Sequence, residues 1–455
     1  MQTTLSMSAL GPILSSLSRA NAAYSGVYPG EAIDRQPVQT VYGGAHLFRR
    51  DSARRLGDLA LGSLREYAAD AATFGRVIGL GGGASLVSAV YEAVKEKLAR
   101  EPVEDFRIDF EDGYGVRPEA EEDACAVQAA GEVAAGMREG SLPPFIGIRI
   151  KNFGAETHAR GIRTLDLFLT ALSRQSGGRL PENFVVMLPK VVSAAQVATL
   201  IDLFEVFEGA GLFPKGSLKM EFMVETTQSV IDSSGRVPIP DFVRAARGRC
   251  VSVALGVYDY TASIGVTAGN QRIDHGACDF ARHVMQVSLG GSGLYLSDGA
   301  TNIMPAPPHK ASDGLALTAA QAEENRAAVH GGWRLHFEHV RRSLSHGYYQ
   351  GWDLNPAQLP TRYAAVYSFF KEALPGATER LRNFVDKVAR ATIAGGGVFD
   401  DAATAQGLLT FFIQGLRRRA ITEEEVAATG LTAEEIRTRS FVEIVTSRGL
   451  LKNRG

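Results

Sequence analysis

The chain has 455 residues, 45% hydrophobic and 22% charged, a size and composition that suit a globular enzyme built on a large barrel with added segments. Its formal net charge of −2 gives no electrostatic footprint for nucleic acid or for an anionic membrane surface, which excludes a bulk polyanion as the partner. The three widely separated cysteines indicate a reducing compartment without a disulfide framework.

Residues 1–36 form a Ser/Ala-rich arm with turn chemistry at Tyr28-Pro29-Gly30. The first thirty residues lack the basic start and the compact apolar run of a secretory signal. No stretch of about 18 uncharged apolar residues, the length needed to cross a bilayer, is found in the sequence. We therefore expect a cytoplasmic protein that contacts no membrane.

From residue 37 to residue 375, short apolar runs alternate with longer segments of helical period, which is typical of a parallel sheet with helical crossovers. The pattern predicts an α/β fold, a (β/α)8 TIM barrel that forms the catalytic domain. We expect its strands over residues 39–47, 105–110, 145–150, 184–188, 219–224, 251–257, 293–296 and 349–354. The expected helices include residues 52–69, 84–100, 119–138, 194–208 and 319–345.

The glycine-rich stretch from Gly79 to Ala84 fits the dinucleotide pattern G-x-G-x-x-A and precedes a helix. Such a loop binds a pyrophosphate only when it follows a strand of a Rossmann half. Here the preceding strand would be very short, at Arg76-Val77-Ile78, and the sheet continues well past a Rossmann half. We therefore assign no dinucleotide site to this stretch.

Residues 376–455 read as purely helical, with a glycine hinge at Gly395-Gly396-Gly397. This C-terminal extension is too short for an independent enzyme domain. It is long enough to serve as a lid or as an oligomer arm.

Polar residues follow the ends of six predicted strands, at the face of a barrel where its chemistry lies. They include several carboxylates, an arginine and a lysine, without a cysteine or histidine cage. This is oxygen-ligand chemistry for a hard cation, with positive charge nearby for an anionic substrate. The six segments are residues 108–112, 147–152, 186–190, 222–226, 254–259 and 294–298.

Glu225 and Asp259 end two successive strands of the predicted sheet. Since adjacent strands lie roughly 5 Å apart, the two carboxylates could share one small cation such as Mg²⁺ and leave positions open for water and substrate. Alternatively, each acid caps the helix that follows it. The spacing leaves both interpretations open.

Arg149 is a candidate for gripping a substrate carboxylate or enolate, or for an ion pair with Asp109, Glu111 or Asp112 on the neighbouring strand. Glu111 and Asp112 are expected to line the site. Lys190 is either a rim cation or a Schiff-base nucleophile, and the metal-like pair of acids makes a metal–enolate mechanism simpler.

Four histidines, at positions 330, 336, 339 and 346, lie along one predicted helix. They do not form H-E-x-x-H, and we expect solvated or packing roles. The phosphate-binding loop G-x-x-x-x-G-K-[ST] and the nucleophile elbow G-x-S-x-G are both absent from the sequence, which excludes the commonest NTPase and serine hydrolase classes.

In this order, five of the segments resemble the citrate lyase β-subunit/HpcH-HpaI aldolase family, which includes malyl-CoA and citramalyl-CoA lyases. The resemblance covers about residues 38–300 and matches the family patterns "D-L-E-D", "R-I-N", "L-P-K", "E-T" and "G-x-x-D". The matching residues are Asp109-Phe110-Glu111-Asp112, Arg149-Ile150-Lys151-Asn152, Leu188-Pro189-Lys190, Glu225-Thr226 and Gly256-Val257-Tyr258-Asp259.

The resemblance implies a barrel of the phosphoenolpyruvate/pyruvate type, with Mg²⁺ (or Mn²⁺) held by Glu225 and Asp259. It implies that Arg149 holds the substrate's carboxylate or enolate oxygen during a reversible aldol or Claisen-type cleavage. A C-terminal acid that reaches a neighbouring subunit is also implied, for which Asp400 is the candidate. A homo-oligomer is expected by the same analogy.

The chain departs from the family pattern in the spacing of its motifs, in the stretch from Gly79 to Ala84 and the helical tail, and within two of the motifs. Lys151 is inserted into "R-I-N", and the histidine of "I-H-P-x-Q" is lost in Leu354-Asn355-Pro356-Ala357-Gln358. The fold and the metal are therefore expected to carry over better than the substrate.

The first hypothesis is a Mg²⁺-dependent carbon–carbon lyase or aldolase, with a small hydroxy or keto acid, or its coenzyme A thioester, as substrate and a metal-stabilised enolate as intermediate. The second is a condensing enzyme of the malate synthase kind. The third is a barrel that binds a dicarboxylate or a nucleotide without turnover.

Overall fold

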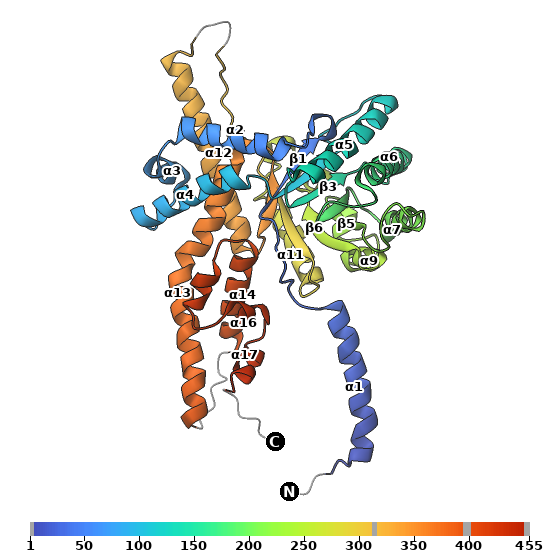
Figure 1. Cartoon of the computed structure of the whole chain (residues 1–455), viewed down its shortest axis with the longest axis vertical. Helices are drawn as coiled ribbons and strands as arrows, with labels where there is room; N and C mark the ends of the chain where they lie inside the picture. Colours follow the sequence, from blue (N-terminus) through green and yellow to red (C-terminus); the bar gives the residue numbers. More distant parts are fainter. Residues whose placement is uncertain (1–3, 312–315, 395–401, 450–455) are drawn as a thin grey trace.

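The computed structural model describes residues 4–311, 316–394 and 402–449 and contains a closed barrel of parallel strands in the order β1 to β8 (Figure 1). The predicted (β/α)8 barrel is thus confirmed. Its strands are buried on both faces, which explains why they read as nearly continuous apolar runs. The strands are β1 (Gln39–Gly44), β2 (Asp105–Asp109), β3 (Phe145–Arg149), β4 (Phe184–Leu188), β5 (Lys219–Val224), β6 (Cys250–Leu255), β7 (Tyr295–Ala300) and β8 (Gln350–Asp353).

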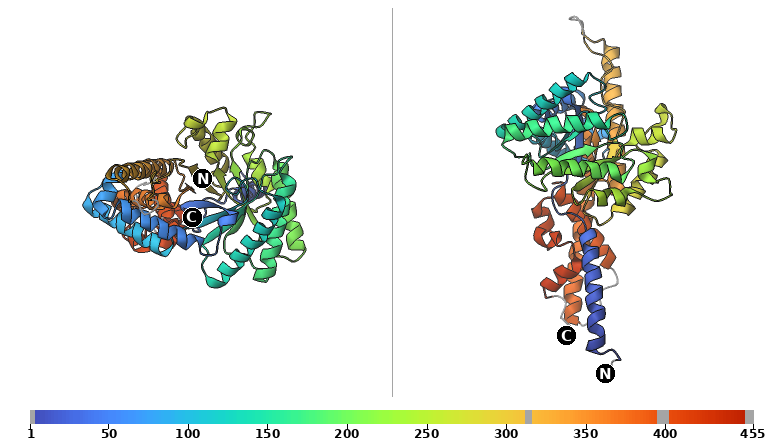
Figure 2. Two further views of the ribbon diagram at one scale, coloured as in Figure 1. Left: turned by 90° about the horizontal axis from the view of Figure 1, so that it is seen from above. Right: turned by 90° about the vertical axis from the view of Figure 1, so that its right-hand side faces the viewer.

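Helices surround the barrel and project from both of its ends (Figures 1 and 2). In and around the barrel lie α2 (Ser52–Tyr67), α3 (Ala71–Ile78), α4 (Ala84–Arg100), α5 (Glu119–Glu139), α6 (His158–Ser176), α7 (Ala194–Gly209), α8 (Thr227–Val230), α9 (Ile239–Ala245), α10 (Val257–Ser263), α11 (Gly276–Leu289) and α12 (Ala319–Ser345). The N-terminal helix is α1 (Met7–Val27), and the C-terminal helices are α13 (Leu359–Ala394), α14 (Ala402–Arg417), α15 (Glu423–Ala427), α16 (Ala433–Arg437) and α17 (Phe441–Ser447).

The interior of the barrel is layered, because every second residue of a strand points inward. A charged layer fills the amino end, where Arg107 Nε donates to Glu221 Oε1 at 2.5 Å. Above it lies an apolar layer that is separate from the main core outside the barrel. That layer consists of Met187, Met223, Ala254, Ala300 and Trp352, with Tyr42, Tyr258 and Leu354 packed against it.

Several predicted strand boundaries were wrong, in two cases because a turn of helix begins where the strand was expected to continue. The first strand stops at Gly44 and a short 3₁₀ helix occupies residues 45–47. The sixth stops at Leu255, because α10 begins at Val257. The seventh runs over residues 295–300 instead of 293–296. The last spans residues 350–353.

The stretch from Gly79 to Ala84 follows a helix, α3, which the sequence did not predict. Gly79 ends that helix in the left-handed region, at φ 74°, a conformation that glycine adopts without steric cost. Because Arg76-Val77-Ile78 is helical, the loop lacks the strand that a dinucleotide fold needs.

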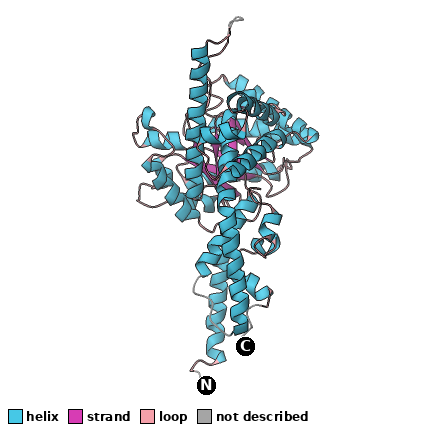
Figure 3. Cartoon of the chain, turned by 90° about the vertical axis from the view of Figure 1, so that its left-hand side faces the viewer, coloured by secondary structure: helices cyan, strands magenta, loops and turns pink. Residues whose placement is uncertain are grey.

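The C-terminal extension lies at the amino end of the barrel. Arg417 Nε donates to the carbonyl of Asp34 at 3.0 Å, and the backbone N–H of Gln36 donates to the carbonyl of Arg417. Both contacts lie just before β1. Figures 1 and 3 show α1 and the helices of the extension projecting from this end in the same direction. The proposed boundary at 375/376 falls inside α13, a single helix of 36 residues with Pro375 within it.

α1 is exposed along almost its whole length. It forms most of the predicted Ser/Ala-rich arm, residues 1–36, and it contains one charged residue, Arg19. Among the described residues, no helix combines the length and apolarity that crossing a membrane requires.

Candidate active site

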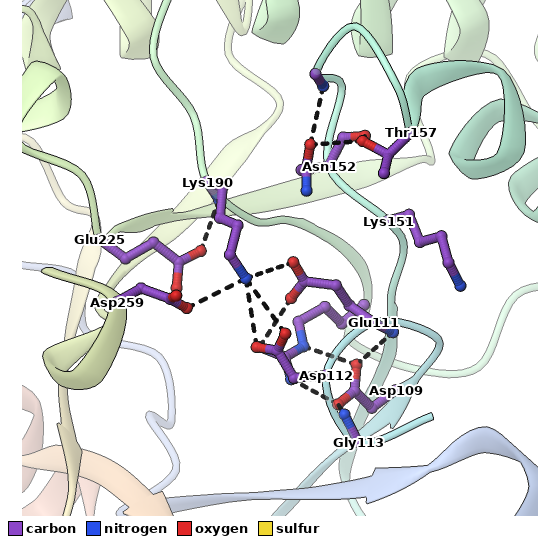
Figure 4. Close-up of polar contacts among 12 residues, drawn as sticks. Asp109, Glu111, Asp112, Gly113, Lys151, Asn152, Thr157, Lys190, Glu225 and Asp259 are labelled. Carbon is purple, nitrogen blue, oxygen red and sulfur yellow. Dashed lines mark hydrogen bonds and ion pairs between the residues drawn. The ribbon is translucent and has the colours of Figure 1, made fainter. Parts of the chain in front are cut away.

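The carboxyl end of the barrel gathers charged side chains around Lys190 (Figure 4). Lys190 Nζ donates to Glu111 Oε1 at 2.6 Å and lies 3.1 Å from Asp259 Oδ2. It also lies 3.3 Å from Asp112 Oδ1. The loops after β2, β4 and β6 therefore meet at one ammonium group, as the positions of these residues at strand ends predicted.

Glu225 follows β5 and is 2% exposed. Its Oε1 accepts a 2.6 Å hydrogen bond from the backbone N–H of Lys190, a residue held at φ 50°. A non-glycine residue in this left-handed region is strained, and such strain concentrates at functional sites. The interpretation of Glu225 as a helix cap is wrong, because Thr226 caps α8.

Asp259 lies in the first turn of α10, with 42% of its side chain exposed. The cap position belongs to Gly256, which offers no side chain. A Cβ at Gly256 would lie 2.5 Å from Glu225 Oε2, so any larger residue would displace that carboxylate. Gly256 thus belongs to the site for a steric reason, and the "G-x-x-D" pattern was the signal for it.

The pKa values of two side chains show how strongly these charges interact. Burial raises the pKa of Glu225 to about 8, since the attraction of Lys190 is weaker than desolvation and the Glu111 carboxylate adds repulsion. Burial alone would lower the pKa of Lys190, but the carboxylates of Glu225 and Glu111 outweigh it and raise that pKa. Lys190 therefore stays an ammonium at neutral pH, which favours the rim-cation interpretation over the Schiff base.

Arg149 is held rigidly by Asp109 on the neighbouring strand. Its Nε and Nη2 donate to the two carboxylate oxygens of Asp109 at 2.7 and 2.5 Å. Nη1 lies farther from carboxylates, 3.3 Å from Glu111 Oε2 and 3.5 Å from Asp112 Oδ2. The guanidinium is thus oriented by a bidentate pair while Nη1 remains loosely bound, so both interpretations of Arg149 can hold together.

The donor set fits a hard divalent cation. Five carboxylates, those of Asp109, Glu111, Asp112, Glu225 and Asp259, surround only two cationic side chains. The pKa of Glu225 is raised mainly by burial, which the nearby Lys190 ammonium offsets only in part. In the described part of the chain no three or more His, Cys, Asp or Glu side chains form a closed metal cage. Two protein ligands would leave room for water and substrate.

Several other residues from the sequence patterns lie outside this cluster. Lys151 Nζ donates to Glu122 Oε2 and to the carbonyl of Phe110, and it points away from Lys190 (Figure 4). Asp298 does not line the site, because it faces outward and accepts from Arg282 Nε at 2.9 Å. Asp400 lies outside the described residues.

The segment that replaces "I-H-P-x-Q" has a structural role. Gln358 is buried, and its Oε1 accepts from the backbone N–H of Leu354 at 2.8 Å. His336 is fully buried and hydrogen-bonds Asp353 and Thr361, which confirms a packing role for it.

The sequence did not predict the aromatic floor of the site, which Tyr42 and Trp352 form beside Arg149. The ring of Tyr42 lies 4.9 Å from Arg149 Cζ, and the ring of Trp352 lies 5.7 Å from it. The two rings lie 4.2 Å apart. The sequence predicts these two residues only as parts of β-strands. A usable signal was their inward position on two strands that meet when the barrel closes.

The charged state of Lys190 gives a direct test of the Schiff-base alternative. We expect borohydride treatment in the presence of pyruvate to leave no adduct on Lys190, because an ammonium is not a nucleophile. Mass spectrometry of the digested protein would detect a reduced adduct. A stoichiometric adduct on the peptide that carries Lys190 would contradict the rim-cation interpretation.

Comparison with known proteins places this site in context. The family model described as a domain of unknown function, DUF6986, matches residues 17–444. No curated protein matches the chain. A citrate lyase from Burkholderia xenovorans LB400 superposes with a TM-score of 0.51 at 17% identity, covering 89% of this chain and 99% of its own. At that identity the likeness establishes the barrel fold alone.

Two other solved structures are less similar. A malate synthase from Haloferax volcanii gives a TM-score of 0.45 at 15% identity, over 73% of this chain and 76% of its own. A citrate lyase beta subunit from M. tuberculosis, complexed with oxaloacetate and magnesium, gives 0.37 at 16% identity, over 72% and 96%.

Proposed function

Since the chain belongs to the DUF6986 family, a family of unknown function, we propose its activity from the site itself: a Mg²⁺-dependent carbon–carbon lyase acting on a small hydroxy or keto acid or its coenzyme A thioester. The observation that carries the proposal is the cluster of Glu225 and Asp259 around Lys190, with the oriented Arg149 beside it. Negative side chains in excess, next to fixed positive ones, suit a site that takes up a cation together with an anionic substrate.

In this proposal Glu225 and Asp259 hold Mg²⁺ or Mn²⁺. The metal, when bound, polarises the substrate carbonyl and stabilises negative charge. Arg149 holds a substrate oxygen through its loosely bound Nη1, and the ion pair with Asp109 fixes its direction. Lys190 keeps Glu225 in place through its backbone N–H and adds positive charge near the oxygen that becomes negative as the carbon–carbon bond breaks.

Glu111 and Asp112 orient the two cations in the proposed site. Glu111 contacts both Lys190 and Arg149, and its burial raises its own pKa against the attraction of Arg149. Asp400 is proposed as an acid/base at the site of a neighbouring subunit.

This function can be tested by measuring proton exchange at the carbon that becomes part of the enolate. We expect the protein with Mg²⁺ to exchange the methyl protons of pyruvate or of acetyl-CoA with deuterium from solvent, measured by proton NMR. Exchange that vanishes on chelation and in Glu225→Gln would support the proposal. Binding of pyruvate or oxalate without exchange of either probe would favour a binding barrel, and malate formed from glyoxylate and acetyl-CoA would identify a condensing enzyme.

A homo-oligomer is proposed as well, supported by the exposed stripe on α1. Leu10, Leu14, Leu17 and Tyr24 recur at helical spacing on one face, and the last three are 48%, 54% and 65% exposed. A helix with a single charge and an exposed apolar face is marginal alone in water. The same stripe on a second copy would cover it without bringing like charges together.

We expect Leu14→Glu together with Leu17→Glu to lower the molar mass measured by light scattering after size exclusion, because four charges would meet across a paired stripe. The matched control, Ser15→Glu with Ala22→Glu, places the same charges on the opposite face of α1 and should leave the mass unchanged. Equal masses for wild type and both variants would contradict a role of α1 in assembly.

A further inference from the structure

The floor of the candidate site contains a hydrogen-bond donor without a partner. Trp352 is 9% exposed, and its indole Nε1 is buried without a hydrogen-bond acceptor. An indole nitrogen can only donate, and buried donors in folded proteins nearly always have an acceptor. The other tryptophan, Trp333, obeys this rule, since its Nε1 donates to the carbonyl of Ala357.

The position of this donor relates it to the site. Trp352 lies on β8, packs against Tyr42 and has Arg149 Cζ 5.7 Å from its ring centroid. The neighbours that share its layer, Met187, Met223, Ala254 and Ala300, offer the indole no side-chain acceptor stronger than a thioether sulfur. The indole N–H is therefore an isolated polar point in an apolar floor beneath a guanidinium.

We propose that the Trp352 indole N–H donates to an oxygen at the inner end of the bound substrate, next to Arg149. This inference rests on the proposed function and adds a substrate-binding residue to it. It also selects the substrate: the end that reaches the floor carries a carboxylate or carbonyl oxygen. An apolar acyl end would leave the donor unpaired, and sites built around a polar contact reject ligands that lack it.

The ion pairs of Arg149 support a shared contact. Asp109 occupies Nε and Nη2 of the guanidinium, while Nη1 lies 3.3 Å or more from its nearest carboxylate oxygens. A carboxylate has two oxygens, so it can accept from Nη1 and from the indole together. Planar recognition by two donors of different residues would fix the orientation of the acid in the barrel.

The experiment uses the full chain with Mg²⁺ and oxalate as the probe. In a spectrum of ¹⁵N-labelled protein, the two tryptophans give two indole signals, and Trp352→Phe identifies which belongs to Trp352. We expect oxalate to shift the Trp352 indole proton downfield, as hydrogen bonding does. The Trp333 signal should stay in place, because its N–H is already bonded.

Calorimetry gives the second readout. Trp352→Phe keeps an aromatic ring against Tyr42 and removes the donor, so we expect oxalate affinity to fall about tenfold, as for the loss of one hydrogen bond to a charged group, while Mg²⁺ affinity stays the same. Trp333→Phe, remote from the cluster, should bind oxalate like wild type.

Two results would overturn the inference, and they are distinguishable. Oxalate that binds wild type and Trp352→Phe equally, with an unmoved Trp352 signal, would reject the donor role and leave the proposed lyase intact. Failure of wild type to bind oxalate with either Mg²⁺ or Mn²⁺ would reject the proposed function, and the role of Trp352 with it.

Discussion

The affinity for Mg²⁺ is expected to fall about 100-fold or more in Glu225→Gln. Even the mutation of residues that only hydrogen-bond to metal ligands typically lowers metal affinity about 10- to 100-fold. Glutamine keeps the shape of Glu225 and an oxygen for the backbone N–H of Lys190, but it removes the charge from a buried position. Asp259→Asn should have the same direction of effect. Titration calorimetry with Mg²⁺ and Mn²⁺ in the presence of oxalate measures both.

The matched control is Asp241→Asn, an exposed acid on α9 whose ion pair, among the residues that the structure describes, is with Arg244. It removes one negative charge from the protein without touching the cluster, so it should bind the metal like wild type. Unchanged metal affinity in Glu225→Gln and Asp259→Asn would rule out these two residues as ligands. The charge cluster around Lys190 would then be an ion-pair network only.

The raised pKa of Glu225 adds a pH dependence to the same measurement. Below its pKa of about 8 the metal must displace a proton, so affinity should rise about tenfold per pH unit up to pH 8 and then level off. For the metal-free protein the sign is opposite. A carboxyl with a raised folded pKa contributes stability at low pH that is lost as pH rises through about 8. Heat unfolding at pH 6 to 9, with and without Mg²⁺, tests both.

Arg149→Met is expected to destabilise the fold by about 3–5 kcal/mol, because it leaves the carboxylate of Asp109 buried and unpaired. Asp109 is 0% exposed and forms the bidentate pair described above. The double variant Arg149→Met with Asp109→Leu should recover much of this loss, since replacing both members of a buried pair is often nearly neutral. Urea unfolding gives the free energies.

Arg54→Met is the control, because in the described part of the chain Arg54 forms exposed pairs with Asp51 and Asp58, and this substitution should cost about 1 kcal/mol or less. Arg149→Lys separates stability from chemistry. It keeps the charge but loses the bidentate geometry, so activity should fall about 10²- to 10³-fold. A single variant Arg149→Met as stable as wild type would show that the pair with Asp109 is not what holds this end of the barrel.

The sequence predicted the barrel because its strands are buried on both faces and separated by helices of regular period. It also predicted which strand ends carry the charges, since parallel strands bring their carboxyl ends together. This reasoning failed for Asp298, which was expected at the site and lies outside it. The pairing of β7 with β8 shifts register between Ser297 and Ala300, which turns Asp298 toward Arg282, and no alternation pattern reveals such a shift.

Other parts depended on contacts between distant segments. Tyr42 and Trp352 lie more than 300 residues apart and become neighbours only when β1 pairs with β8. The left-handed backbone of Lys190 accompanies its hydrogen bond to Glu225, which directly follows the next strand. Such features belong to the closed barrel and not to any local pattern.

The continuity of α13 has a mechanical consequence. At 36 residues it is about 54 Å long, with its first half packed against helices around the barrel, where Tyr363 and Phe370 are fully buried, and its second half in the extension. Since no loop separates the two halves, one continuous helix joins the barrel to the extension. A protein shortened at residue 375 would lose the second half of α13. It would also lose α14, whose Phe411 packs against Phe370 and covers it. Conversely, a force on the outer half of α13 would be transmitted to α12 and α4, the helices that pack against its inner half.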